Sequence, residues 1–411
     1  MRGFFIRAGC ALRKGSKMNS GGKKMKRKLK SALSLLLCMI MVFGAVAVGG
    51  DGIGELFNGS KAEAAGYSVG DIITFGSYPQ SEVTKESDSA TYAKLETAKK
   101  NWVSYEYYSG NGDYGSMKQG DWMEYADMDI NGDGANDYRA VRFTQYRPVV
   151  TYISHEHTYQ IENGYIMESE NYYFKYEPLK WQVLDPTKGL VLSKTIIDSQ
   201  AYSNTIYKNG TDAYGKTAYW NNASYTKYAN DYATSSIRKW LNEDFYNIAF
   251  TSAQKQNILP TTLDNKAFVT SQSEYDSVST TDKIFLLSYS DAKNASYGFT
   301  DSEARKAMGT DYAKAQGLFE DYYKYRDGYS DWNLRSAGNS SDVTCEVESD
   351  GGVHAAYSDV GYTDKGVRPA LRLSNLASDI FESDLSKVKD DEYAIFVTDA
   401  EGNRLPGAVV T

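Results

Sequence analysis

The segment Asp129–Asp137 carries the residues whose types and spacing best suit a chemical role. Its sequence, DINGDGAND, follows the spacing D-x-N-x-D-G-x-x-D, with a glycine where such a loop must turn sharply. A hard cation such as Ca²⁺ needs several oxygen ligands from one loop. The pattern predicts a structural Ca²⁺ site with side-chain ligands at its first, third, fifth and ninth positions and a backbone carbonyl at its seventh, namely Asp129, Asn131, Asp133, Asp137 and Ala135.

The loop differs from an EF-hand in one respect. Ala140 occupies the twelfth position, where an EF-hand has a bidentate glutamate, and a strand pattern follows instead of a helix. The loop therefore resembles the calcium hairpins of integrin-type β-propellers. We expect an ion to brace the hairpin rather than to hold a substrate. An Asp/Asn/Gly turn without an ion is the alternative interpretation.

Two further pairs of residues could bind a metal or act in catalysis. His155 and His157 would lie on one face of a strand, but they lack a nearby third ligand, and an exposed strand explains them as well. Cys345 and His354 could form a nucleophile and its base. A lone cysteine is more often a small buried apolar residue, and we favour that interpretation.

The sequence shows no pattern of a known enzyme class. A Gly-rich phosphate loop, a nucleophile elbow and a metalloprotease helix are all missing. Arg335 and Arg368 could bind an anion, although arginines that bridge strands are the commoner case. Carboxylates are abundant, so paired acids that hydrolyse a polysaccharide remain a competing interpretation. We predict a protein that is not an enzyme.

Short strands and a few helices must position these residues. Apolar residues recur at spacings of three and four after Ser235, which predicts a helix over 235–250. The mixture of elements indicates an α+β fold rather than repeated βαβ units. We also expect strands at 69–75, 139–143, 180–184, 190–193 and 283–287, short strands within 332–373, a turn at 76–80, and helices near 93–102, 252–259 and 300–308.

The N-terminal segment has the form of a secretory signal. Basic residues between Lys23 and Lys30 precede an uncharged apolar run over 32–48, which is shorter than the ~20 residues of a membrane-spanning helix. The small residues of Ala62-Glu63-Ala64 suit signal peptidase, so we predict cleavage after Ala64. The mature protein would be secreted or held at the cell surface. It would meet the membrane only through an uncleaved signal segment.

Composition narrows the range of partners. Residues 65–411 hold 33 basic and 50 acidic residues, a formal net charge of −17, which repels nucleic acid. Cys10 and Cys38 lie in the signal segment, which leaves Cys345 without a partner for an intrachain disulfide. The chain has 35 tyrosines alongside many Asn, Ser and Gly residues, a mixture typical of surfaces that bind glycans or proteins. Half-buried strand positions could equally account for the tyrosines.

The C-terminal stretch is a separate segment. Its sequence EYAIFVTDAEGNRLPGAVVT resembles the first hairpin of immunoglobulin-like β-sandwich modules, and one hairpin cannot bury both faces of a sheet. We therefore divide the chain into a signal peptide and spacer (1–64), an α+β domain (65–378) and the start of a truncated immunoglobulin-like module (388–411).

Four motifs in order carry a family resemblance. They are GDIITFGSYPQ at 70–80, KWQVLD at 180–185, WNLRSAG at 332–338 and GVRPAL at 366–371. Together they resemble an uncharacterised family of exported bacterial domains with an FGSYPQ start and a WLRSPG to VRPAL finish. The finish is similar to that of formylglycine-generating-enzyme-like domains, and it implies a C-type-lectin-like or sulfatase-modifying-factor-like fold. The oxidase activity of such enzymes needs two cysteines, whereas the mature chain has one.

These observations predict an exported, non-catalytic binding module for an extracellular glycan or protein, with Ca²⁺ as a structural cofactor. The alternatives are an exported polysaccharide hydrolase that uses paired carboxylates, and a structural part of a larger surface protein. A shallow face of Tyr and Trp would favour binding. Two convergent carboxylates about 5 to 10 Å apart in a deep pocket would favour the hydrolase.

Overall fold

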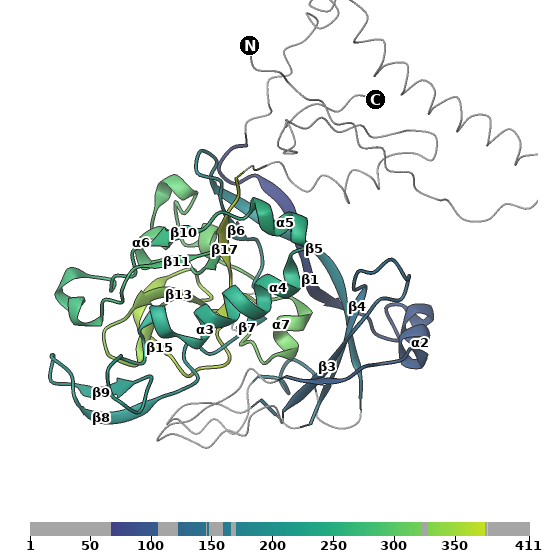
Figure 1. The fold of residues 1–411 in the computed structure, drawn as a ribbon, viewed down its shortest axis with the longest axis horizontal. Helices are drawn as coiled ribbons and strands as arrows, with labels where there is room; N and C mark the ends of the chain where they lie inside the picture. The colour runs from purple at the N-terminus through teal and green to yellow at the C-terminus, as the bar shows by residue number, and fades with distance from the viewer. Residues whose placement is uncertain are drawn as a thin grey trace, which may run out of the picture. The chain divides into compact units, whose positions relative to one another are not determined.

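Short strands outnumber helices in the part of the chain that the structure describes. The computed structural model describes residues 67–105, 122–144, 146–147, 159–165, 170–321, 328–374 and 376 (Figure 1). They belong to one compact unit, Tyr67–Asp379. The predicted signal segment (1–64) and the predicted C-terminal module (388–411) lie outside the described residues. Antiparallel and mixed sheets with a few short helices confirm the predicted α+β class.

The larger sheet has eight strands in the order β12-β17-β6-β5-β4-β3-β2, with β1 also paired to β5. Strand β5 organises it, because β4 pairs with its first residues, β6 with its last residues and β1 with most of its length, all antiparallel. The predicted hairpin at 180–193 is confirmed as β5 and β6. The strands are β1 (Ile72–Glu82), β2 (Val103–Ser104), β3 (Met123–Met128), β4 (Tyr138–Phe143), β5 (Tyr172–Asp185), β6 (Leu190–Ser193), β12 (Ile284–Phe285) and β17 (Ala370–Arg372).

Strand β1 continues through the segment where the sequence predicts a turn at 76–80. Gly76 has a φ of +77° and lies at a register shift between Thr74 and Ser77, so the strand forms a bulge instead of reversing. A Cβ atom at this glycine would lie 2.6 Å from Cε1 of Phe250. The bulge lets residues on both of its sides face the core.

The second sheet has five strands in the order β15-β14-β13-β16-β7. Its β13–β16 pair is parallel and its other pairs are antiparallel. The strands predicted within 332–373 are confirmed in this sheet and in β17. Its members are β7 (Asp198–Ser199), β13 (Trp332–Ala337), β14 (Val343–Val347), β15 (Val353–Asp359) and β16 (Gly366–Val367). Two ribbons complete the strands, β8 (Tyr207–Thr211) with β9 (Thr217–Trp220), and β10 (Thr261–Leu263) with β11 (Thr280–Asp282).

The predicted helix at 235–250 is confirmed as three consecutive segments, α3 (Ser236–Trp240), the π-helical η2 (Leu241–Phe245) and α4 (Tyr246–Ala249). The Ser235 side chain caps its start by accepting from Arg238 N. The periodic apolar residues are buried, namely Ile237, Trp240, Leu241 and Phe245. The other short helices are α2 (Ser89–Thr97), η1 (Tyr232–Thr234), α5 (Ser252–Asn257), η3 (Thr270–Tyr275), α6 (Tyr289–Ala292), η4 (Ala295–Tyr297), η5 (Glu303–Arg305) and α7 (Asp311–Ala315).

The predicted helix at 300–308 is wrong. Only the 3₁₀ turn η5 forms there. The residues that follow pair with other segments instead, since Ala307 O accepts from Ser330 N and Met308 O accepts from Ile196 N. These long-range bonds satisfy carbonyls that a helix would have used locally.

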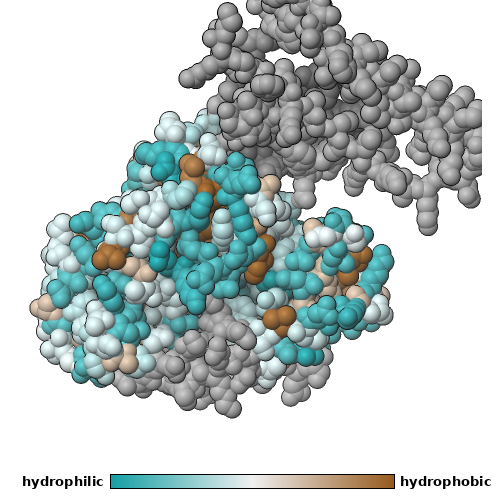
Figure 2. Space-filling model, viewed as in Figure 1, coloured by the Kyte–Doolittle hydropathy of each residue, from teal (hydrophilic) through white to brown (hydrophobic). Residues whose placement is uncertain are grey.

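One hydrophobic core joins the two sheets and the α3–α4 helix. It includes Trp181 of the larger sheet, Trp332 of the smaller sheet and Trp240 of α3. A second, smaller cluster lies under α2 around Leu95 and Tyr173. On the face shown in Figure 2, hydrophobic residues are scattered in small patches among hydrophilic ones.

Candidate ligand-binding face

Six aromatic side chains gather around the β8–β9 hairpin, at the lower left of Figure 1. We call this group the aromatic face. Five members come from the hairpin and the loop after it, and the sixth, Tyr275, ends η3. The members are Tyr207, Tyr214, Trp220, Tyr225, Tyr228 and Tyr275.

The rings of the aromatic face contact one another in an unbroken series. Trp220 and Tyr228 are stacked, with ring centroids 4.5 Å apart and an interplanar angle of 25°. Tyr225 lies edge-on to Trp220 at 6.3 Å. Tyr275 connects Tyr228, at 5.4 Å, to Tyr214, at 5.1 Å. Tyr225 is 40 % exposed and Tyr214 is 37 % exposed, so the series presents ring surface to solvent at two places.

The loop between Trp220 and Tyr228 holds Tyr225 in an unusual conformation. Its φ is +52°, the only positive value for a residue other than glycine in the part of the chain that the structure describes. The Asn222 side chain closes the loop, because its Oδ1 accepts from Ser224 N (3.1 Å) and Thr226 N (3.3 Å). A bulky residue at positive φ is strained, and such strain is concentrated at functional sites.

Hydrogen bonds hold the partly buried rings in place. Trp220 Nε1 donates to Asn209 O at 2.9 Å, and the Tyr275 hydroxyl donates to the buried Asp212. The Tyr228 hydroxyl donates to Glu274 Oε1 at 3.3 Å. Burial, together with Glu274, raises the pKa of Tyr228 to about 12, so its hydroxyl stays neutral at physiological pH. The face is therefore ordered before a ligand arrives, which reduces the entropy lost on binding.

The predicted calcium loop joins β3 and β4 and is largely exposed. Asp129 Oδ1 accepts from Gly132 N (2.6 Å), and Asp129 Oδ2 accepts from Gly134 N (2.8 Å). Asp137 Oδ2 accepts from Ile130 N (2.7 Å). Each of the four predicted side-chain ligands has an oxygen that accepts a hydrogen bond from a backbone amide of the loop; they are Asp129, Asn131, Asp133 and Asp137. The amide that contacts Asp133 is that of Ala135.

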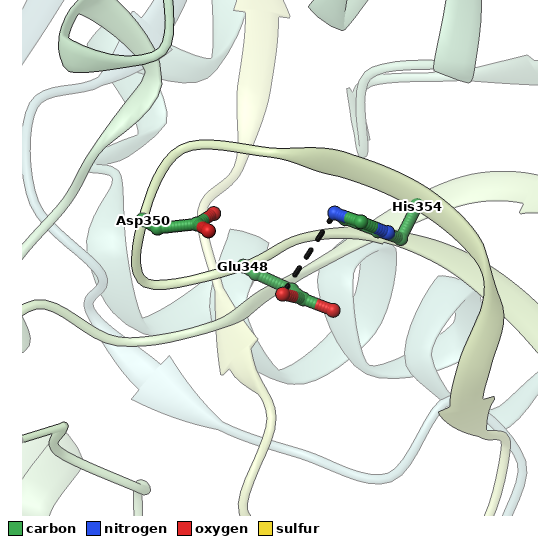
Figure 3. Close-up of side chains that lie close together, drawn as sticks. All are labelled: Glu348, Asp350 and His354. Carbon is green, nitrogen blue, oxygen red and sulfur yellow. Dashed lines mark ion pairs between the residues drawn. The ribbon is translucent and has the colours of Figure 1, made fainter.

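The structure does not bring Cys345 and His354 together as a nucleophile and base. Cys345 is fully buried on β14, and burial raises the pKa of its thiol. Its neighbour Glu346, and not Cys345, is the cross-strand partner of His354, and the Cys345 thiol contacts Ala337 O instead, at 3.5 Å. His354 instead lies beside Glu348 (Figure 3). His155 and His157 lie outside the described residues.

Arg335 and Arg368 both bridge parts of the fold. Arg335 Nη1 donates to Leu286 O at 2.9 Å and to Asp291 Oδ2 at 3.0 Å. Arg368 Nε donates to Ser193 O at 2.8 Å, and its guanidinium lies over the ring of Trp332. Burial lowers the pKa of Arg368 to about 9. Both side chains are buried, so neither is presented to an anionic ligand at the surface.

The abundance of tyrosine is evident from the sequence, whereas the aromatic face is not. Five of the six members lie within residues 207–228, interleaved with Asn, Gly, Thr and Lys. A local search for aromatic residues among turn-forming polar residues would have found this stretch. Tyr275 could not have been found in that way, because it joins the others only through the tertiary fold.

Comparison with known proteins finds one family model that is similar to part of the chain. Residues 188–375 match a family with the description "Domain of unknown function (DUF6273)". The match fits the predicted resemblance to an uncharacterised domain family. No curated protein and no solved structure matches the chain. Within the described ranges, none of the helices is both long enough and apolar enough to span a membrane.

Proposed function

We propose that this chain is an exported, non-catalytic module that binds a glycan through the aromatic face. The observation that carries the proposal is the strained, exposed Tyr225 beside the Trp220–Tyr228 stack. Rings of this kind stack on the apolar faces of sugar rings, while neighbouring amides and carboxylates bind hydroxyl groups. The surrounding segment carries charges of both signs, with Lys208 and Lys227 as well as Asp212 and Glu274. It therefore favours neither an anionic nor a cationic sugar, and we expect an uncharged glycan.

A glycan array tests this proposal with the mature chain, residues 65–411. We expect Tyr225→Ala and Trp220→Ala to weaken binding of the best glycan at least tenfold, because each removes a contact ring. Tyr92→Ala is the matched control, since this half-buried tyrosine lies on α2 at the opposite side of the unit (Figure 1). Unchanged binding by Tyr225→Ala, binding of a protein ligand alone, or release of cleaved sugar would each overturn the proposal.

The predicted C-type-lectin-like arrangement belongs to the same proposal. It is supported by the first and last strands, β1 and β17, which lie in one sheet separated by β5 and β6. Export is supported by the basic and apolar segments before Ala64. Sequencing the N-terminus of the protein recovered from culture medium should give Ala65 as the first residue. A full-length chain in the cytosol would contradict export.

We also propose that Ca²⁺ braces the loop between β3 and β4. The support is that oxygens of Asp129, Asn131 and Asp133 are already gathered in one loop by backbone amides. We expect Ca²⁺ to raise the melting temperature of the mature chain, and to do so less in Asp133→Asn, which keeps the amide contact but loses a charge. An equal rise in both proteins would contradict this site.

A further inference from the structure

The tip of the β14–β15 hairpin brings one imidazole and two carboxylates together (Figure 3). Glu348 follows β14, Asp350 lies in the turn and His354 lies on β15. His354 Nε2 is 3.8 Å from Glu348 Oε2, and one donor atom from each of the three residues lies within 4.8 Å of the other two. The His354 side chain is 40 % exposed, so ions in solution can reach the cluster. The cluster shares no residue with the aromatic face.

The turn that carries these residues is anchored to a neighbouring loop. Gly351 has a φ of +81°, and a Cβ atom there would lie 1.9 Å from Ser302 O. Arg305 Nε donates to Gly351 O at 2.7 Å. These contacts fix the backbone of the turn, and a fixed backbone keeps ligating side chains in place.

A second glycine makes room for the side chains to converge. A Cβ atom at Gly352 would lie 2.5 Å from His354 Nε2 and 2.9 Å from Asp350 Oδ1. The imidazole of His354 and the carboxylate of Asp350 therefore occupy space that a Cβ atom at position 352 would take. Gly352 N also donates to Asp350 Oδ1 at 2.7 Å, which orients this carboxylate.

The charges next to the hairpin tip favour a cation. Glu346, the cross-strand partner of His354, is buried next to the hairpin tip. Lys365 Nζ lies 2.6 Å from Asp331 Oδ2 and 2.8 Å from Glu346 Oε2, so this lysine already forms ion pairs with two carboxylates. Glu348 and Asp350 add two negative charges at the hairpin tip, and Arg305, whose Nε donates to Gly351 O, adds one positive charge. The remaining negative charge would be offset by a bound cation.

We propose that Glu348, Asp350 and His354 bind a divalent transition metal of the Zn²⁺ class. An imidazole nitrogen with two carboxylate oxygens suits Zn²⁺, whereas Ca²⁺ takes oxygen ligands. Two ligands at ~2.1 Å from one zinc ion can lie at most ~4.2 Å apart, and the Glu348–His354 pair at 3.8 Å is within that limit. The ligand atom of Asp350 lies within 4.8 Å of the other two, so it is at most about 0.6 Å beyond that limit. A movement of this size in the partly exposed Asp350 side chain would complete a three-residue set, with water in the fourth position.

Calorimetric titration of Zn²⁺ into the chelator-treated mature chain tests the site. We expect His354→Gln and Asp350→Asn each to lower the zinc affinity at least tenfold, because each removes one ligand. Melting curves in chelator should coincide with that of the wild type, which separates ligand loss from unfolding. Asp350→Asn keeps the size of its side chain, so it serves as the test if His354→Gln fails to fold.

Two matched controls assign the zinc to this hairpin. The double variant His155→Gln/His157→Gln removes the other histidines of the mature chain and should bind zinc at this site as the wild type does. Asp133→Asn, in the loop predicted to bind Ca²⁺, should also leave zinc binding unchanged. Zinc binding by His354→Gln equal to that of the wild type, or no zinc binding by the wild type, would overturn the proposal.

Discussion

Among single residues, Asp198 stands out as a carboxyl group placed in the hydrophobic core. It is fully buried and accepts from the Tyr78 hydroxyl (2.8 Å), Ser199 N (2.7 Å) and Gln200 Nε2 (3.0 Å). Burial raises the pKa of Asp198 to about 6, although these donors and Arg147 oppose the shift. The carboxyl group is therefore easier to protonate in the folded protein than in the unfolded chain, where an aspartate has a pKa of about 3.9.

This shift makes stability depend on pH. Because the pKa of Asp198 is higher in the folded protein than in the unfolded chain, protonation of its carboxyl group stabilises the fold. This stabilisation is complete below about pH 4 and is lost as the pH rises through 6. Between pH 5 and pH 7, Asp198 alone should lower the free energy of unfolding by about 1.4 kcal/mol. Asp198→Asn cannot titrate, so we expect urea unfolding to show a smaller loss over this range. An unchanged pH dependence in this variant would contradict the assignment.

The sequence revealed local residue patterns but not distant contacts. The spacing of the predicted Ca²⁺ ligands at 129–137 can be recognised in the sequence, since one loop supplies all of these ligands. The bond between Tyr78 and Asp198 joins residues 120 positions apart, and no spacing rule connects them. The same holds for Tyr275 in the aromatic face, and for Glu348 and Asp350, which the sequence analysis did not consider as partners of His354.

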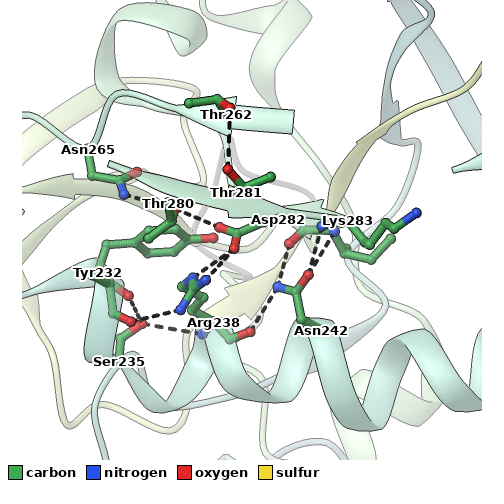
Figure 4. Close-up of polar contacts among 12 residues, drawn as sticks. Tyr232, Ser235, Arg238, Asn242, Thr262, Asn265, Thr280, Thr281, Asp282 and Lys283 are labelled. Atoms are coloured by element: carbon green, nitrogen blue, oxygen red, sulfur yellow. Dashed lines mark hydrogen bonds and ion pairs between the residues drawn. The ribbon is translucent and has the colours of Figure 1, made fainter. Parts of the chain in front are cut away.

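Among the secondary-structure elements, a partly buried ion pair connects α3 to the β10–β11 ribbon (Figure 4). Arg238 Nε and Nη2 donate to Asp282 Oδ1 at 2.8 and 2.6 Å. Asp282 is 1 % exposed, and its Oδ2 accepts from Thr280 Oγ1 at 2.8 Å. Asn242 Nδ2 extends the connection to Ile284 O at 2.8 Å. The Arg238–Asp282 pair is thus a charged contact between the helix and the ribbon.

We expect Arg238→Met to lower the free energy of unfolding by about 3 kcal/mol, because it leaves the buried Asp282 carboxylate without its cation. Lys239→Met is the matched control on the same helix. Lys239 is exposed and lies 3.9 Å from an exposed Glu243, so its replacement should change stability by less than about 0.5 kcal/mol. Denaturant unfolding of both variants measures the difference. Equal effects would show that the pair does not couple the two elements.

Elements with a strong local period were predicted correctly. The helix at 235–250 has a helical spacing of apolar residues, and the hairpin at 180–193 has turn residues between two apolar runs. These local patterns identify both elements without reference to distant contacts. The turn predicted at 76–80 was wrong because pairing with β5 carries the chain through a glycine bulge. The helix predicted at 300–308 was wrong because its last carbonyls accept from segments far along the chain.

In the molecule as a whole, the matched family region does not coincide with the folded unit. The match begins at residue 188, within the turn between β5 and β6, so it leaves out β1 and β5. Those strands supply Phe75 and Trp181 to the core, and Trp181 Nε1 donates to Phe75 O at 2.7 Å. Without them, one edge of β6 and much of the core would be exposed to water.

We therefore expect a fragment of residues 188–375 to lack a cooperative thermal transition, whereas residues 65–378 should unfold cooperatively. Near-ultraviolet circular dichroism during heating provides the measurement, since the buried tryptophans report fixed packing. Adding a separately expressed segment of residues 65–187 should restore the signal. A cooperative transition in the short fragment alone would show that β1 and β5 are dispensable.

The position of β1 and β17 in one sheet has a consequence for how the unit can be attached. Four residues face one another in turn across the adjacent strands β1, β5, β6 and β17, namely Ile72, Gln182, Leu192 and Ala370. The start of β1 and the end of β17 therefore leave at the same end of the sheet, three strand spacings or ~14 Å apart. About five extended residues could bridge that gap. The unit can be grafted into a surface loop of a host protein, with both junctions on the side away from the β8–β9 hairpin (Figure 1).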